Sequence, residues 1–206
     1  MNQYFTNNEN LKSDIKTIQF NIFDETYFLY SDNGVFSKDG VDYGTRLLLE
    51  TLPMSNMQGK VLDVGCGYGP IGLTVKRRTN CEVDMVDVNL RALHLTELSA
   101  TKNKLNVNVY ESDAYTNVEG TYNCIITNPP IRAGKKKVYE ILIGAYDYLK
   151  NDGSLWFVMR KDQGVKSTLK DIENYYNLSI ESKKKGFFVV CATKKVKSVD
   201  KAWYVW

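Results

Sequence analysis

The fold of this chain is decided by the stretch Val61-Leu-Asp63-Val-Gly65-Cys-Gly67-Tyr-Gly69-Pro-Ile-Gly72. In it an apolar run leads into alternating glycines, which let the backbone turn sharply and let a ligand approach without a clash at Cβ. Pro70 suits the first position of a helix. The stretch therefore predicts a strand, a ligand-binding turn and a helix, in that order.

Short apolar runs alternate with amphipathic segments after this turn, which is typical of an α/β fold with a mostly parallel, doubly wound sheet and helices on both faces. The last two runs are joined by Lys183-Lys-Lys-Gly186, too short for a helix, so we expect an antiparallel hairpin there. Ahead of the turn, two strands and a helix should form a small β cap. The expected strands are 15–22, 27–30, 60–64, 82–87, 107–111, 122–127, 154–160, 178–182 and 186–193, and the expected helices are 41–52, 70–78, 90–103, 136–149 and 164–175.

The composition fits one globular domain, since the 206 residues are 43% hydrophobic and 25% charged. We expect a flexible arm over 1–13, a domain over 14–195 with its cap at 14–53, and a tail over 196–206. No apolar run is long enough to span a membrane, and the polar N-terminus does not resemble a secretory signal, which predicts a cytoplasmic protein. A single histidine and cysteines without CxxC spacing argue against a metal site.

Two cofactors fit the glycine turn. It matches the GxGxxG fingerprint of dinucleotide sites, and Asp87 stands 20 residues after Gly67, where an acid binds ribose hydroxyls. NAD is therefore one candidate. Asp63 favours S-adenosylmethionine, because an acid ahead of the glycines is placed to receive an ammonium group that NAD lacks. His94 belongs to a helix surface, away from strand ends, and offers no hydride-transfer machinery. Asp113 follows the third strand of the parallel sheet and fits either an adenine amino group or an Asx turn.

A second motif follows the fourth strand, where Asn123-Cys-Ile-Ile-Thr leads into Asn128-Pro129-Pro130. Open α/β sheets place their chemistry at such strand ends. Each proline restricts the residue before it to extended conformations and removes a competing N–H donor. The Asn128 side-chain oxygen and the Pro129 carbonyl would hold both hydrogens of a conjugated amine and turn its lone pair toward a sulfonium methyl. Such catalysis works by positioning and electrostatics.

Three segments, Gly34–Leu49, Leu62–Gly72 and Asn128–Gly134, resemble class I S-adenosylmethionine-dependent methyltransferases of the small-subunit rRNA guanine-N2 (RsmC-like) type. The resemblance covers the chain from about Asp14 to Lys194. It implies a Rossmann-like fold, S-adenosyl-L-methionine as cofactor, and methylation of the exocyclic N2 of a guanine in 16S rRNA. It also implies catalytic roles for Asn128, Pro129 and Pro130, and cofactor contacts from Phe36, Thr45, Asp63, Gly65, Cys66, Gly67, Asp87, Val88, Asp113, Ala114 and Asn128.

The sequence departs from the family pattern in two places. Ile131 stands where many amino methyltransferases have an aromatic residue, so stacking on the acceptor must come from elsewhere, for example from Phe36. The better-known rRNA enzymes carry a duplicated N-terminal half, and this chain resembles only their catalytic half. Self-association could substitute for the other half, so a monomer and a homodimer both stay open.

Basic residues favour RNA as the partner, although the net charge of +3 is only mildly basic. Cations beside a site attract phosphates, and four of them, Arg132, Lys135, Lys136 and Lys137, follow the proposed catalytic loop. Lysines 183–185 on the hairpin and the aromatic tail Trp203-Tyr204-Val-Trp206 are weaker candidates. Adenine N6 and a protein glutamine amide are alternative acceptors, and a nicotinamide oxidoreductase and an inactive cofactor-binding module are alternative classes. The intact Asn-Pro-Pro motif argues against the last.

Overall fold

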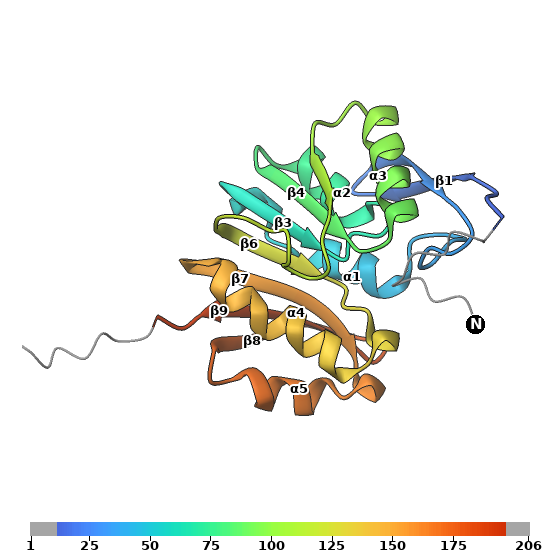
Figure 1. Cartoon of the computed structure of the whole chain (residues 1–206). Helices are drawn as coiled ribbons and strands as arrows, with labels where there is room; N and C mark the ends of the chain where they lie inside the picture. The colour runs from blue at the N-terminus through green and yellow to red at the C-terminus, as the bar shows by residue number, and fades with distance from the viewer. Residues whose placement is uncertain (1–11, 197–206) are drawn as a thin grey trace, which may run out of the picture.

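The computed structural model describes residues 12–196, and within them one seven-stranded sheet carries helices on both faces (Figure 1). The strand order is β5-β4-β3-β6-β7-β9-β8, and β9 is antiparallel to both its neighbours. The predicted fold class is therefore confirmed, including the C-terminal hairpin. The strands are β3 (Lys60–Val64), β4 (Glu82–Asp87), β5 (Asn108–Glu111), β6 (Tyr122–Thr127), β7 (Leu149–Arg160), β8 (Tyr176–Lys184) and β9 (Phe187–Lys194).

Each face of the sheet is covered by its own set of helices. On one face α1 (Tyr43–Thr51), α2 (Pro70–Arg78) and α3 (Leu90–Lys102) share a core, and on the other face α4 (Lys135–Tyr148) and α5 (Val165–Ile172) share a second one. Successive strand side chains enter opposite cores, as Val61 and Leu62 do. Burial on both faces explains why these strands read as continuous apolar runs rather than as alternating ones.

The N-terminal cap is a two-stranded antiparallel sheet of β1 (Lys16–Ile22) and β2 (Glu25–Ser31), which lies against α3 (Figure 1). The backbone N–H of Tyr30 donates to Ser99 Oγ at 2.9 Å, and Asn103 Nδ2 donates to the carbonyl of Phe28 at 2.6 Å. These bonds fix the cap, and with it the segment that leads from β2 to α1.

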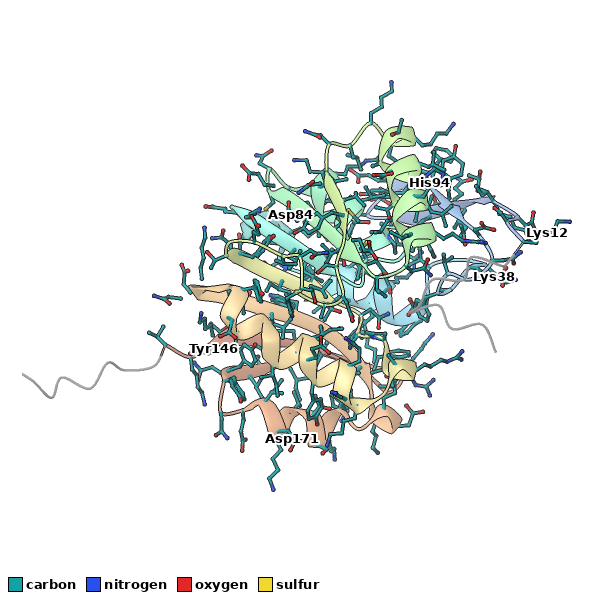
Figure 2. All side chains as sticks on the ribbon, in the orientation of Figure 1. Lys12, Lys38, Asp84, His94, Tyr146 and Asp171 are labelled. Carbon is teal, nitrogen blue, oxygen red and sulfur yellow. The ribbon has the colours of Figure 1, made fainter. Side chains whose placement is uncertain are left out.

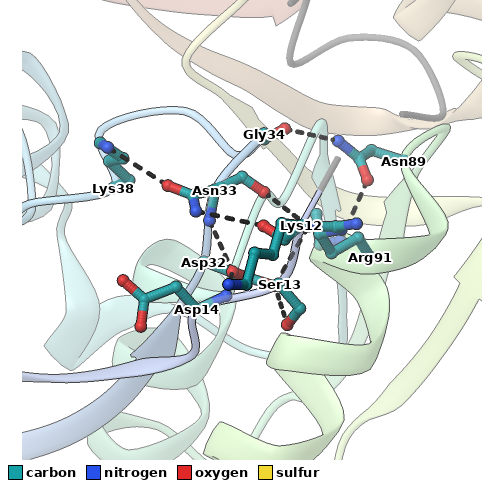
Figure 3. Close-up of polar contacts among 10 residues, drawn as sticks. Lys12, Ser13, Asp14, Asp32, Asn33, Gly34, Lys38, Asn89 and Arg91 are labelled. Carbon is teal, nitrogen blue, oxygen red and sulfur yellow. Dashed lines mark hydrogen bonds and ion pairs between the residues drawn. The ribbon is translucent and has the colours of Figure 1, made fainter. Parts of the chain in front are cut away.

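That segment is anchored at its start by a polar cluster around the buried Asp32 (Figure 3). The Asp32 carboxylate accepts from Ser13 Oγ at 2.7 Å and pairs with Arg91 of α3 at 3.3 Å. Asn89, just before α3, donates through Nδ2 to the carbonyl of Gly34 at 3.0 Å. The chain from 32 to 37 is thereby held at the N-terminus of α3, where the sheet's carboxyl edge lies.

Element ends differ from the expected ones mainly in the last third of the chain. Helix α5 ends at Ile172, and β8 begins at Tyr176 and continues to Lys184. The hairpin turn is therefore the two-residue pair Lys185-Gly186, with φ of +48° and +79°. Two-residue turns of type I′ need positive φ at both positions, which glycine adopts readily. The pattern also missed three short 3₁₀ helices in the described part of the chain: Met54–Asn56, Ile131–Ala133 and Lys161–Gln163.

The predicted arm and tail fall almost entirely outside the described residues, since the structure describes neither 1–11 nor 197–206. The suggested role of Trp203, Tyr204 and Trp206 lies in that part. Among residues 12–196, no helix combines the length and the apolar character that crossing a membrane requires.

Candidate active site

A cavity of about 290 Å³ opens at the carboxyl edge of the parallel strands, the edge that faces right in Figure 1. Loops after β3, β4, β5 and β6 form its walls, and the segment between β2 and α1 closes it from the cap side. The structure brings together at this cavity most of the residues singled out from the sequence. Those that line it are Phe36, Thr45, Gly65, Cys66, Gly67, Asp87, Val88, Asp113, Ala114, Asn128, Pro129, Pro130, Ile131, Arg132 and Lys137.

The glycine turn presents bare backbone to this cavity. Gly65 and Gly67 have φ of +71° and +57°, and a Cβ built on either would meet no atom within 4 Å. A side chain there would occupy the cavity itself and would also strain the backbone. Both features fit a ligand that lies directly against the main chain.

Asp87 lies at the end of β4 and faces the same cavity. Its Oδ2 accepts from the backbone N–H of Gly67 at 2.9 Å, and its Oδ1 accepts from that of Asn89 at 2.9 Å. Desolvation raises the pKa of Asp87 above its ordinary value. Each oxygen keeps further acceptor capacity, which suits the two hydroxyls of a ribose diol. The helix cap belongs to Asn89, whose side chain accepts from the N–H of Ala92.

Asp63 is buried beneath the glycine turn and does not line the cavity. Its Oδ2 accepts from the N–H of Gly72 at 2.8 Å, while its Oδ1 has no hydrogen-bond partner among the described residues. Burial raises its pKa to about 7, and the negative charge of Asp87 adds to the rise. The orphaned oxygen fits a cationic ligand group near the turn, since a buried carboxylate is stabilised by an opposite charge. A direct contact between Asp63 and the cofactor stays a prediction.

The Asn128 side chain is held by a chain of hydrogen bonds that the sequence did not reveal. Its Nδ2 donates to Thr45 Oγ1 at 3.0 Å and lies 3.5 Å from Asp42 Oδ2. Thr45 Oγ1 donates to Asp42 Oδ2 at 2.6 Å, and the backbone N–H of Thr45 donates to Asp42 Oδ1 at 3.1 Å. Asp42 is thus both the N-cap of α1 and the end of the chain.

The polarity of this chain fixes which way the Asn128 amide points. An ionised carboxylate can only accept hydrogen bonds. The Thr45 hydroxyl therefore donates its one proton to Asp42 and accepts from Asn128 through a lone pair. The Asn128 nitrogen therefore faces Thr45, and its oxygen remains as an acceptor. This network assigns the amide orientation. The result is an acceptor beside the cavity, next to the rigid Pro129-Pro130 turn.

Two of the four cations proposed to bind RNA are engaged by carboxylates. Lys137 pairs with Asp113 at 2.8 Å and with Glu140 at 2.7 Å. Lys135 pairs with Asp171 at 3.3 Å. Arg132 and Lys136 are exposed and have no carboxylate partner within the described ranges, and of these two only Arg132 lines the cavity.

Two further residues at the cavity, Asp42 and Gln163, were not identified from the sequence. Asp42 carried a signal, since Asp three residues before Thr45 at the start of a helical pattern is typical of an N-cap. Its contact with Asn128, 86 positions away in the chain, depends on the tertiary structure and has no signal in the sequence. Gln163 also lines the cavity, and no motif marked it. His94 is exposed on α3, as expected of a helix-surface residue (Figure 2).

The comparison with protein families decides which class of site this is. Residues 26–191 match the model of the methyltransferase small domain. The chain belongs to the methyltransferase small domain family. This membership favours S-adenosylmethionine over a nicotinamide as the cofactor, and confirms the expectation of a class I methyltransferase.

Known relatives of this methyltransferase fall into two groups by length. It is 41% identical over 199 residues to the uncharacterised protein YbxB of Bacillus subtilis, covering 93% of this chain and 98% of that protein. It is 36% identical over 186 residues to the ribosomal RNA small subunit methyltransferase C of Psychromonas ingrahamii, covering 87% of this chain and 52% of that one. The chain thus spans about half the length of the methyltransferase C relatives.

A solved structure supports the same relationship. The 16S rRNA N2 methyltransferase RsmC of T. thermophilus, solved with AdoMet and guanosine, superposes with a TM-score of 0.79 at 25% sequence identity. The superposition covers 88% of this chain and 51% of that chain.

Proposed function

We propose that this methyltransferase transfers the methyl group of S-adenosylmethionine to the exocyclic N2 of a guanine in small-subunit rRNA, a cytoplasmic substrate. One observation carries the proposal: the Asn128 oxygen is kept as an acceptor beside a cavity lined by bare glycine backbone. The relatives named ribosomal RNA small subunit methyltransferase C support the acceptor, and so does the guanosine bound to the T. thermophilus enzyme.

The residues of the cavity can hold the cofactor at three points. Backbone at Gly65 and Gly67 would hold its methionine part, Asp87 would accept from its ribose hydroxyls, and the segment 112–114 would hold its adenine. When bound, the cofactor supplies an electrophilic methyl group on a positively charged sulfur. Asp63 contributes negative charge under the turn, which favours a cationic ligand over a neutral one.

The chain's own contribution to the reaction is positioning. The lone pair of a guanine amino group is delocalised into the ring. The nitrogen is therefore a poor nucleophile as long as the amino group is coplanar with the ring. Asn128 Oδ1 and the Pro129 carbonyl each accept one of the two N–H hydrogens, which turns the nitrogen so that its lone pair faces the methyl. As the new N–C bond forms, the bond from the methyl to sulfur breaks and leaves a neutral thioether, while positive charge grows on the nitrogen, where these two oxygens would stabilise it. One proton then leaves to water.

Asp42 and Thr45 act as positioning residues in this scheme. An amide turned by 180° would present N–H donors to the target amine and repel it. Because the Thr45 hydroxyl donates its proton to the carboxylate of Asp42, it can only accept from Asn128, and the Asn128 amide has one favoured orientation. The Asn128 amide is therefore oriented before the acceptor binds. A dipole that is already oriented lowers the activation barrier most, because it does not have to reorient during the reaction.

Acceptor identity is tested by incubating the purified protein with small ribosomal subunits or with 16S rRNA and isotopically labelled S-adenosylmethionine. Mass spectrometry of the nuclease-digested RNA should find the label in N2-methylguanosine. The Asn128→Ala variant, assayed in parallel, controls for contaminating activity. Label in N6-methyladenosine or in methylglutamine of a ribosomal protein would contradict the guanine assignment and leave the methyltransferase class intact.

A further inference from the structure

The β8–β9 turn lies at the edge of the sheet that carries the active site. Strand β7 runs parallel to β6 and ends at Arg160, which pairs in register with Phe187 at the start of β9. Lys184, at the end of β8, pairs with the same Phe187. The backbone N–H of Lys161 donates to the carbonyl of Gly186 at 2.8 Å, which ties the turn to the end of β7.

Packing against α1 fixes the turn beside the cavity. The rings of Phe187 and Tyr43 lie 5.4 Å apart between centroids, and a Cβ on Gly44 would approach Phe187 to 2.9 Å. Tyr43 follows Asp42, which lines the cavity. On the other side, Gln163, also a lining residue, accepts from the backbone N–H of Arg160 at 2.8 Å. The turn therefore contacts the chain neighbours of two cavity-lining residues, Asp42 and Gln163.

Four exposed cations gather here, and we call them the hairpin rim: Arg160, Lys161, Lys184 and Lys185. Arg160 pairs with Asp162 at 2.8 Å, whereas the three lysines have no carboxylate partner in the part of the chain that the structure describes. Lys185 Nζ lies 4.8 Å from the centre of the Tyr43 ring, which holds its charge next to the N-terminus of α1. The three lysines of the rim thus carry positive charge that no carboxylate of the described residues pairs with.

This state contrasts with that of Lys135 and Lys137 at the start of α4, although Lys136 between them is also without a carboxylate partner in the described residues. Lys135 forms an ion pair with Asp171, and Lys137 forms ion pairs with Asp113 and Glu140. A phosphate that approaches Lys135 or Lys137 must compete with carboxylates, whereas Lys161, Lys184 and Lys185 have no carboxylate partner among residues 12–196. Release of condensed counterions by such lysines is the main source of affinity for a nucleic-acid backbone.

We infer that the hairpin rim binds the phosphate backbone of the RNA next to the target nucleotide. The inference rests on the proposed function, because a guanine that reaches the cavity unpaired or flipped carries its flanking phosphates to the cavity mouth. A strand leaving the cavity past Asp42 and Tyr43 crosses Lys185 and Lys184 first. The lysines at the start of α4 then make a smaller contribution.

The test compares two variants of equal net charge. The rim variant carries Lys161→Gln, Lys184→Gln and Lys185→Gln, which removes the charges and keeps the aliphatic stems. The control variant carries Lys16→Gln, Lys102→Gln and Lys150→Gln, exposed lysines on β1, at the end of α3 and near the start of β7. Affinity for a 16S rRNA fragment is measured at several salt concentrations, together with S-adenosylhomocysteine affinity and melting temperature.

The rim variant should bind the RNA about 10-fold or more weakly at low salt, and its slope of log K against log salt should fall in magnitude by about 2, since each phosphate contact contributes about 0.7 to 0.9. The control variant should lose much less, and both should bind S-adenosylhomocysteine as the wild type does. Equal losses in both variants, or wild-type affinity of the rim variant, would overturn the inference. Poly-glutamate bound as tightly as RNA would also overturn it, while a wild type that methylates no RNA would refute the proposed function instead.

Discussion

Replacing Asn128 by alanine should lower kcat about 100-fold to 1,000-fold, the range found when one preorganised polar group is removed from an active site. The substitution deletes the oxygen that holds one amine hydrogen and leaves the Pro129 carbonyl alone. Asn128 makes its described hydrogen bonds to Thr45 and Asp42 rather than to the glycine turn. Binding of S-adenosylhomocysteine should therefore change little. Single-turnover rates on rRNA and calorimetry with S-adenosylhomocysteine measure the two effects separately.

Matched variants show whether the orientation of the amide matters in addition to its presence. Thr45→Val removes the hydroxyl at nearly constant shape and should cost about 5-fold in kcat, since a lost hydrogen bond is worth about 1 kcal/mol. Thr45→Ser keeps the hydroxyl and should stay close to the wild type. Asp42→Asn still caps α1, because asparagine is a good N-cap, but it can donate as well as accept and should lower kcat. A Thr45→Val enzyme with full turnover would refute the positioning role.

The second large effect is expected for Asp87→Ala, which should raise the dissociation constant of S-adenosylhomocysteine about 100-fold or more. Two hydrogen bonds from ribose hydroxyls to a charged oxygen are lost, each worth about 1.5 to 3 kcal/mol. The N–H of Gly67 also loses its acceptor, which loosens the glycine turn.

Glu82→Ala is the matched control for that measurement, because Glu82 is an exposed acid at the opposite end of the same strand. Its affinity for S-adenosylhomocysteine should equal that of the wild type. Calorimetry gives both constants, and thermal melting without ligand checks that each variant is folded. An Asp87→Ala protein that binds with wild-type affinity would exclude the ribose contact.

The fold was predictable because its signals are local. Strands buried on both faces read as apolar runs, and Pro70 marks the start of α2. The end of α5 was not predictable, because it depends on a tertiary contact. The Tyr176 hydroxyl donates to the carbonyl of Leu142 in α4 at 2.8 Å, and the ring is buried, which draws the chain into β8. Periodicity holds no information about such a partner.

The gathering of residues at the candidate site was predictable wherever a residue stands at or just after the end of a parallel strand, as Gly67, Asp87 and Asn128 do. Those strand ends meet at one edge whatever the details of packing. The hydrogen bonds from Asp42 through Thr45 to Asn128 were not predictable, because they depend on how α1 is placed against the loop after β6. The ion pair of Lys137 with Asp113 likewise joins residues that only the folded chain brings together.

The central claim is that two oxygens, on Asn128 and Pro129, hold the acceptor amine toward the methyl donor. A crystal structure of the protein with S-adenosylhomocysteine and guanosine tests it most directly. The account predicts that the guanine N2 lies about 3 Å from both Asn128 Oδ1 and the Pro129 carbonyl, with the cofactor sulfur on the side of its lone pair. A guanine N2 that faces away from both oxygens, or an Asn128 amide that turns its nitrogen toward the acceptor, would contradict it.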